Sequence, residues 1–185
     1  MSNTVRKPHL LSPEAYLALE ENALEKSEYV DGEIYAMSGT TVRHNRISLN
    51  LAVALKQHLD GRPCETFMAD LKVHAAAANA FYYPDIVVRC QERPLAGDTR
   101  VIADPTLIIE VLSPSTEAID RREKLAAYRR IPSVQEYAIV AQDERSVEIY
   151  RHQGDIGWTY HAFTDDETVD FASVGLTLTL DRIHA

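Results

Sequence analysis

The sequence has few cysteines and no long apolar run. Its 185 residues contain two cysteines, Cys64 and Cys90, and neither belongs to a CxxC motif or to a Cys/His cluster. We therefore expect no zinc site and no disulfide framework, and we interpret both cysteines as reduced packing residues. No stretch approaches the roughly 20 apolar residues that cross a bilayer, and residues 1–8 lack the apolar core of a signal peptide. These absences predict a cytoplasmic protein with no membrane contact.

Positive charge is also scarce. The chain has 19 Lys and Arg residues against 28 Asp and Glu residues, which gives a formal net charge of −9 at pH 7. Such a chain does not adhere broadly to nucleic acid, so any contact with DNA must be local. The length, the 45% hydrophobic content and the lack of internal repeats predict a single domain, residues 1–185.

Hydrophobic periodicity and turn residues predict an α/β fold in which helices flank a mixed β-sheet. Ser12 and Pro13 start a short helix over residues 12–22, whose Tyr16 and Leu19 should face the core. Asp31-Gly32 supplies the tight turn of a hairpin over residues 28–37.

The remaining segments complete this mixed α/β pattern. Segments 66–73 and 81–89 read as an antiparallel hairpin, and strands 106–112 and 134–140 read as a parallel pair joined through a helix. Further helices are expected from Thr40 or Thr41 to Leu59 and over residues 120–130, and further strands at residues 146–151, 158–163 and 174–180.

Two of the predicted strands carry a carboxylate where core residues are expected. Asp85 lies among apolar residues of segment 81–89, and Glu110 among those of segment 106–112. A buried carboxylate is costly unless it is paired or bound to a metal. Two carboxylates on adjacent strands suit one hard divalent cation, Mg²⁺ or Mn²⁺, and Lys124 on the next helix adds a positive charge nearby.

These residues supply the parts that phosphodiester cleavage needs. A metal polarises the phosphate and generates hydroxide, and a cation stabilises the developing charge. A structural interpretation is also open: Asp85 caps a turn, Glu110 pairs with a buried arginine, and Lys124 pairs with Asp120 at the i,i+4 spacing. Residue chemistry alone does not decide between the two.

The order of the motifs resembles the PD-(D/E)xK nuclease superfamily. Pro84-Asp85 is followed by Glu110-Val-Leu112 in a strand–strand–helix context. The superfamily motif has lysine two residues after the second acid, where this chain has Leu112. The resemblance therefore implies that the role of this lysine has moved to Lys124.

A second likeness extends over nearly the whole chain. It rests on these residues and runs: YVDGEIY at 29–35, His44, YPDIVV at 83–88, PTLIIEVLSPST at 105–116, Asp120, Lys124, Tyr128 and EY at 136–137. Together they look like the Uma2 family, which is assigned a restriction-endonuclease-like fold and described as endonucleases. The resemblance implies a metal-dependent endonuclease acting on DNA, with Asp85 and Glu110 at the metal and Lys124 near the scissile phosphate. It also implies Glu33 as a further acid from the N-terminal hairpin.

Other residues near these motifs receive supporting roles. His44 can contact phosphate near a helix N-terminus, although a surface or core histidine is the commoner outcome. Asp120 is expected to cap its helix and orient Lys124. Arg121 and Arg122 are expected in solvent or on a DNA backbone.

Two hypotheses remain. The first is a Mg²⁺- or Mn²⁺-dependent endonuclease without an organic cofactor, working as a homodimer because duplex cleavage needs one site for each strand. The second is a catalytically silent nucleic-acid-binding or assembly protein that retains the fold. Leu112 and the net charge of −9 favour the second. The clustered carboxylates favour the first, because apolar residues are less costly in a purely structural core.

Overall fold

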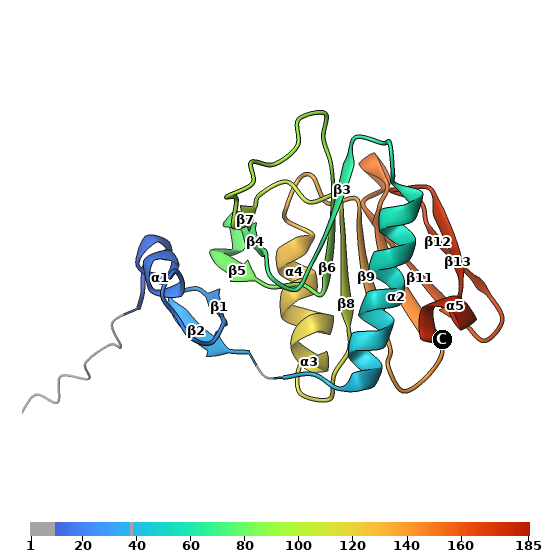
Figure 1. Ribbon diagram of the computed structural model, residues 1–185, viewed down its shortest axis with the longest axis horizontal. Coiled ribbons are helices and arrows are strands. Elements are labelled where there is room, and N and C mark those ends of the chain that lie inside the picture. The colour runs from blue at the N-terminus through green and yellow to red at the C-terminus, as the bar shows by residue number, and fades with distance from the viewer. Residues whose placement is uncertain (1–9, 38) are drawn as a thin grey trace, which may run out of the picture.

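A six-stranded mixed sheet forms the centre of the computed structural model, which describes residues 10–37 and 39–185 (Figure 1). The strand order is β11-β10-β9-β8-β6-β3. β8 and β9 pair in parallel, as the sequence predicted, and the other neighbours are antiparallel. The strands are β3 (Cys64–Met68), β6 (Ile86–Cys90), β8 (Leu107–Val111), β9 (Glu136–Val140), β10 (Ser146–His152) and β11 (Trp158–Thr164).

Two smaller sheets flank this one. The first has the order β2-β1-β5-β4-β7 and contains the predicted N-terminal hairpin, β1 (Ser27–Val30) and β2 (Glu33–Ala36). Asp31 and Gly32 take the positive φ values, 48° and 99°, that its tight turn requires. The other strands of the two sheets are β4 (Lys72–Ala75), β5 (Ala80–Tyr82), β7 (Val101–Ile102), β12 (Thr168–Phe171) and β13 (Leu176–Thr179).

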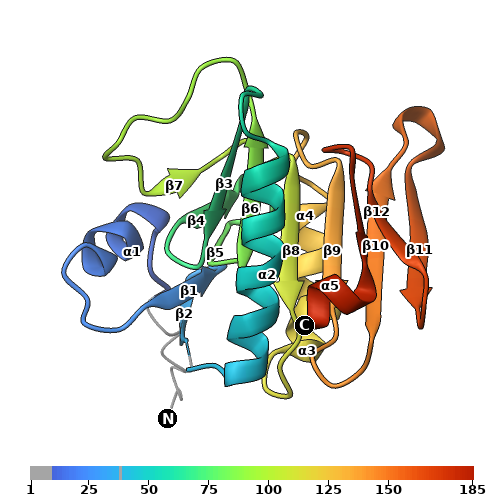
Figure 2. The same cartoon turned by 45° about the vertical axis from the view of Figure 1, so that its right-hand side comes forward.

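Helices cover both faces of the central sheet. α2 (Val42–His58) lies on one face and α4 (Leu125–Tyr128) on the other (Figure 2). α2 forms as predicted, because apolar residues recur at four-residue intervals and Thr41 caps it by accepting a 3.1 Å hydrogen bond from the backbone N–H of His44. The remaining helical elements are α1 (Pro13–Glu20), η1 (Ala76–Ala78), α3 (Glu117–Ile119), the π-helical turn η2 (Asp120–Lys124), η3 (Gly154–Ile156) and α5 (Leu180–His184).

The predicted antiparallel pairing of segments 66–73 and 81–89 is confirmed, but each segment divides between two sheets and does not form one continuous strand. β3 and β6 pair in the central sheet, whereas β4 and β5 pair in the flanking sheet. Ala69, at a φ of 55°, bends the chain between β3 and β4. Pro84, which has no N–H for a sheet ladder, lies in the break between β5 and β6. The second break leaves Asp85 just before β6.

Two smaller expectations fail, and three short elements were not predicted. Leu19 is 57% exposed, whereas Tyr16 is fully buried. The helix after β8 begins at Glu117, so Asp120 lies inside the helical segment and does not cap it. β7, β12 and α5 were not predicted, since they are short and carry weak periodicity.

The expectation of reduced cysteines is wrong as well. Cys64 and Cys90 lie opposite each other in the β3–β6 ladder, with their Cα atoms 4.0 Å apart, and they form a disulfide. Their separation of 26 residues gave no sign of this pairing, because it depends on a strand register that the sequence does not display.

In the described part of the chain, no helix has both the length and the apolar character needed to cross a membrane.

Candidate active site

Asp85 and Glu110 come together through the register of two neighbouring strands. β6 and β8 pair with Ile86 opposite Ile109, so the next position places Asp85 opposite Glu110. The backbone N–H of Val111 donates a 2.7 Å hydrogen bond to Asp85 Oδ2, which ties the Asp85 side chain to β8. The predicted neighbourhood of the two carboxylates is therefore present in the fold.

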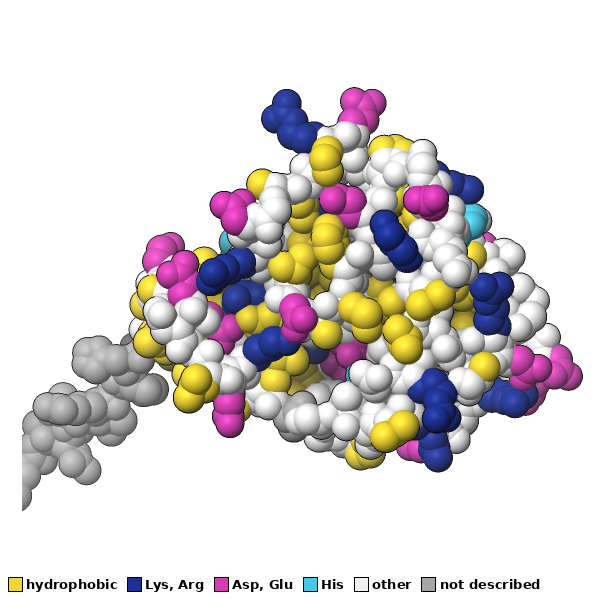
Figure 3. Space-filling view, viewed as in Figure 1, with side chains coloured by type: hydrophobic (Ala, Val, Ile, Leu, Met, Phe, Trp, Pro, Cys, Tyr) yellow, Lys and Arg dark blue, Asp and Glu magenta, His cyan; other side chains and the backbone are white. Residues whose placement is uncertain are grey.

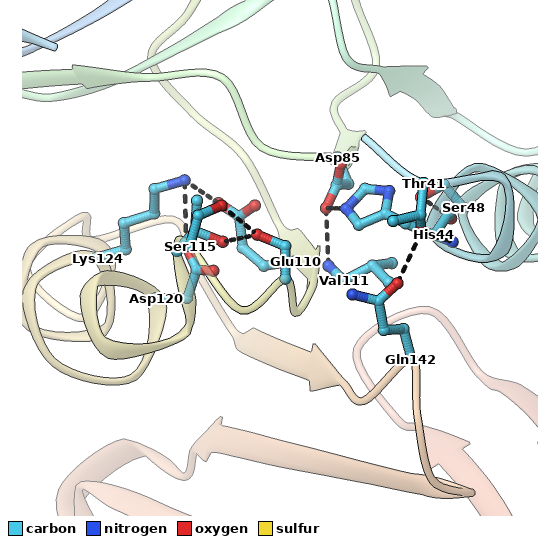
Figure 4. Close-up of polar contacts among 12 residues, drawn as sticks. Thr41, His44, Ser48, Asp85, Glu110, Val111, Ser115, Asp120, Lys124 and Gln142 are labelled. Carbon is cyan, nitrogen blue, oxygen red and sulfur yellow. Dashed lines mark hydrogen bonds and ion pairs between the residues drawn. The ribbon is translucent and has the colours of Figure 1, made fainter. Parts of the chain in front are cut away.

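Glu110 is buried and binds Lys124. The Lys124 ammonium lies 3.1 Å from Glu110 Oε1, and the Tyr128 hydroxyl donates to the same oxygen at 3.1 Å. Burial raises the pKa of Tyr128, and the nearby carboxylate of Glu110 raises it further, so the hydroxyl stays protonated and donates. Figure 4 shows Lys124 pointing back toward Glu110 from the helical segment that follows β8.

A π-helical turn presents two charged residues to the same interior. Asp120 and Lys124 bound the turn, and both are buried. Asp120 Oδ1 lies 3.3 Å from the Lys124 ammonium. Tyr128, one turn later, is also buried, so the predicted shared face of Asp120, Lys124 and Tyr128 is confirmed. π-turns are rare and often accompany functional sites.

Three carboxylates surround the single ammonium of Lys124. Its ammonium contacts Glu28 Oε1 at 3.1 Å in addition to Glu110 and Asp120. Burial lowers the pKa of Lys124, but the three carboxylates outweigh this effect and hold the pKa well above its usual range. Burial raises the pKa of Glu110, and the neighbouring Asp120, Asp85 and Glu28 raise it further against the opposing effect of Lys124. The group therefore favours an added positive charge.

His44 extends the site on the side of Asp85. Its Nε2 lies 3.2 Å from Asp85 Oδ2, and it reaches this position from the first turn of α2. Burial lowers the pKa of His44, but the hydrogen bond and charge of Asp85 outweigh burial and raise it. In Figure 4, Glu110 and Val111 lie between the His44–Asp85 pair and the Lys124–Asp120 pair.

Each of the two central carboxylates keeps one oxygen that receives no donor from the described residues. Lys124 and Tyr128 both donate to Glu110 Oε1, and no residue in 10–37 or 39–185 donates to Oε2. Both contacts of Asp85 likewise use Oδ2, and its Oδ1 receives no donor from the same residues. Within those ranges no group of three or more Asp, Glu, His or Cys residues lies close enough together to hold a metal ion. Mg²⁺ needs no such cluster, because it is commonly bound through one or two carboxylates together with water and substrate phosphate.

The N-terminal hairpin contributes Glu28 to this group in place of Glu33. Glu33 lies on β2, is exposed, and accepts a 2.6 Å hydrogen bond from Tyr35. Glu28 lies on β1, accepts from the backbone N–H of Tyr83 at 3.0 Å, and faces Lys124. Both are glutamates in one short hairpin, and the sequence has no local signal that separates them. The difference arises because β1 pairs with β5 inside the sheet, whereas β2 is at its edge.

Leu112 and the two arginines of η2 do not join the carboxylates. Leu112 is buried in an apolar cluster with Ile108 and Tyr128. Arg121 forms ion pairs with Glu117 at 2.8 Å and with Glu148 at 2.6 Å, so it is not the free cation expected for a DNA contact. Glu110 is paired, but with a lysine and not with the arginine that the structural interpretation required.

Comparison with known proteins agrees with this architecture. The model of the Uma2 family, described as "Putative restriction endonuclease", matches residues 13–181. The uncharacterized protein slr1290 of Synechocystis is 38% identical over 174 residues, which cover 94% of this chain and 91% of that protein. The uncharacterized protein sll1609 of the same organism is 36% identical over 150 residues, covering 80% and 85%.

A solved structure shares the fold. The crystal structure of a "putative nuclease belonging to DUF820" from Anabaena variabilis superposes with a TM-score of 0.77 and 21% identity, covering 94% of this chain and 97% of that one. At this identity the likeness concerns the fold alone. The mixed sheet with flanking helices, preceded by an N-terminal helix and hairpin, is therefore a nuclease-like fold.

Proposed function

Because the chain belongs to the Uma2 family, we propose that it is a metal-dependent endonuclease that hydrolyses DNA phosphodiester bonds. One observation carries the proposal. Lys124 reaches Glu110 from the helical segment after β8, and Asp85 lies opposite Glu110 on the neighbouring strand. Two carboxylates and one lysine are thus neighbours, and this supports the proposal despite Leu112 at the motif position.

Each residue has a distinct role in this proposal. Asp85 and Glu110 hold a divalent cation, which polarises a bound phosphate. Lys124 keeps its proton and offers a positive charge to the phosphate as negative charge develops. Glu28 and Asp120 hold the ammonium in place, and Tyr128 fixes Glu110 by donating to one of its oxygens.

A nuclease assay with a metal series tests the function. Supercoiled and linear DNA is incubated with the wild type in EDTA, Mg²⁺, Mn²⁺ or Ca²⁺, and Asp85→Ala is assayed in parallel. We expect cleavage with Mg²⁺ or Mn²⁺ and none by Asp85→Ala. Absence of cleavage under every metal, by a protein that still binds DNA, would favour the silent nucleic-acid-binding alternative.

We also propose that Asp85 and Glu110 bind one Mg²⁺ or Mn²⁺. Both carboxylates retain an oxygen to which no residue of the described part of the chain donates, and the excess of carboxylates favours a cation. Calorimetric titration with Mn²⁺ should give about one site in the wild type and a large loss of affinity in Asp85→Ala and Glu110→Ala. Unchanged Mn²⁺ binding by both variants would exclude these ligands.

A further inference from the structure

A basic cavity lies beside the candidate active site, at the amino-terminal end of α2. Its volume is about 310 Å³, and three arginines line it, Arg43, Arg46 and Arg145. Two carboxylates, Asp143 and Glu144, also line it. With Asp181, which pairs with Arg145, three carboxylates accompany the three arginines, so Arg46 is the arginine without a carboxylate partner among the described residues. Figure 3 shows basic side chains, with acidic ones among them, at the lower edge of the face around this end of α2 and α5.

The arginines are available to an anion. Arg43 pairs with Asp143 and Arg145 pairs with Asp181, and all four side chains are more than half exposed. Exposed pairs of this kind add little to stability, so a phosphate can take the place of the carboxylate. Arg46 is exposed and makes no ion pair with the residues that the structure describes. A guanidinium binds phosphate with two parallel hydrogen bonds, a geometry that lysine cannot reproduce.

The first turns of α2 link the cavity to the carboxylate site. His44, between Arg43 and Arg46 on α2, contacts Asp85 at 3.2 Å. The Thr41 hydroxyl donates to Gln142 Oε1 at 2.8 Å, and Gln142 lines the cavity. A second cavity of about 290 Å³ shares Gln142, Asp143 and Glu144 and runs on to Leu112, directly after β8. The two cavities thus adjoin each other, and the second reaches the end of the strand that carries Glu110.

We propose that Arg43, Arg46 and Arg145 bind a backbone phosphate of the nucleic acid next to the one held at Asp85 and Glu110. This inference rests on the proposed function and adds the surface by which the substrate is positioned. The second cavity has three carboxylates and a single arginine, Arg121, which pairs with Glu117 and Glu148, so the first cavity is the better place for a phosphate. The sugar-phosphate backbone is therefore anchored at the cavity lined by the three arginines. This cavity gives an acidic chain the local contact that DNA binding requires.

DNA binding by the full chain tests this site without requiring cleavage. Fluorescence anisotropy with a labelled 20-base-pair duplex is measured in EDTA over a series of NaCl concentrations. Arg46→Ala should bind about 3- to 10-fold more weakly and lower the slope of log affinity against log salt by about 0.9. Arg46→Lys should restore part of the affinity, because it keeps the charge and loses the bidentate geometry. Lys56→Ala is the control, since Lys56 is exposed on the same helix about 15 Å further along its axis.

The outcomes separate this site from the nuclease proposal. If the wild type cleaves DNA and Arg46→Ala binds as tightly as Lys56→Ala, the arginine site is wrong and the nuclease proposal stands. If the wild type binds DNA through Arg46 without cleaving it, the arginine site stands and the nuclease proposal fails. Inorganic phosphate that binds through Arg46 to a protein with no affinity for DNA would overturn the assignment to nucleic acid.

Discussion

Lys124 shows that the fold can bring a lysine to Glu110 from a position far along the chain. The position two residues after Glu110 holds Leu112, whose side chain packs in the core. Lys124, fourteen residues after Glu110, contacts that carboxylate instead, because the helical segment after β8 turns back toward the strand. Its long side chain ends among three carboxylates. These contacts hold the ammonium in one place. A group that stabilises charge developing in a transition state needs such a fixed position.

Glu28 and Glu33 give the sharpest prediction for single residues. Glu28→Gln removes one of the carboxylates that position Lys124, so we expect cleavage about 10- to 100-fold slower, since small displacements of a catalytic group cost this much. Glu33→Gln is the matched control on the same hairpin and should cleave at the wild-type rate. Single-turnover kinetics at saturating Mn²⁺ measures both. A slow Glu33→Gln beside a normal Glu28→Gln would reverse the assignment and support Glu33 as the further acid.

At the scale of elements, the sequence predicted those whose signals are local. The Thr41 cap and the four-residue periodicity predicted α2, the Asp31-Gly32 turn predicted the N-terminal hairpin, and the apolar run around Glu110 predicted β8. The division of segments 66–73 and 81–89 between two sheets was missed, because sheet membership is decided by partners far along the chain. The placement of Glu28 and the π-turn at Asp120 were missed for the same reason, since both depend on tertiary packing.

The β3–β6 disulfide also follows from tertiary register, and it leads to a stability prediction. A bond that closes a loop of this length restricts the unfolded chain and stabilises the fold by about 3–4 kcal/mol. Urea unfolding of the wild type should therefore shift to lower concentration when a reductant is added. Cys64→Ala/Cys90→Ala should unfold at the same urea concentration with or without reductant. A wild-type transition that reductant leaves unchanged would show that the bond contributes nothing.

On the scale of the whole molecule, the proposed cleavage of duplex DNA requires a site for each of two strands. The chain carries one Asp85–Glu110 pair, and a two-fold arrangement of chains would present one such site to each strand. We therefore propose a homodimer. Light scattering at micromolar concentration should give about twice the chain mass of 20.8 kDa. A mass of one chain both with and without DNA would remove this proposal.

The cleavage rate of Lys124→Ala, at Mn²⁺ concentrations that saturate the wild type, tests the central claim most directly. We expect the rate to fall by about 10²–10³, the usual cost of losing one preorganised charge at a transition state. The affinity for Mn²⁺ should change far less than in Asp85→Ala, because Lys124 is not a metal ligand. A circular dichroism spectrum matching the wild type ensures that the comparison is between folded proteins. Cleavage at the wild-type rate by this variant would contradict the assignment of Lys124 and with it the account of the active site.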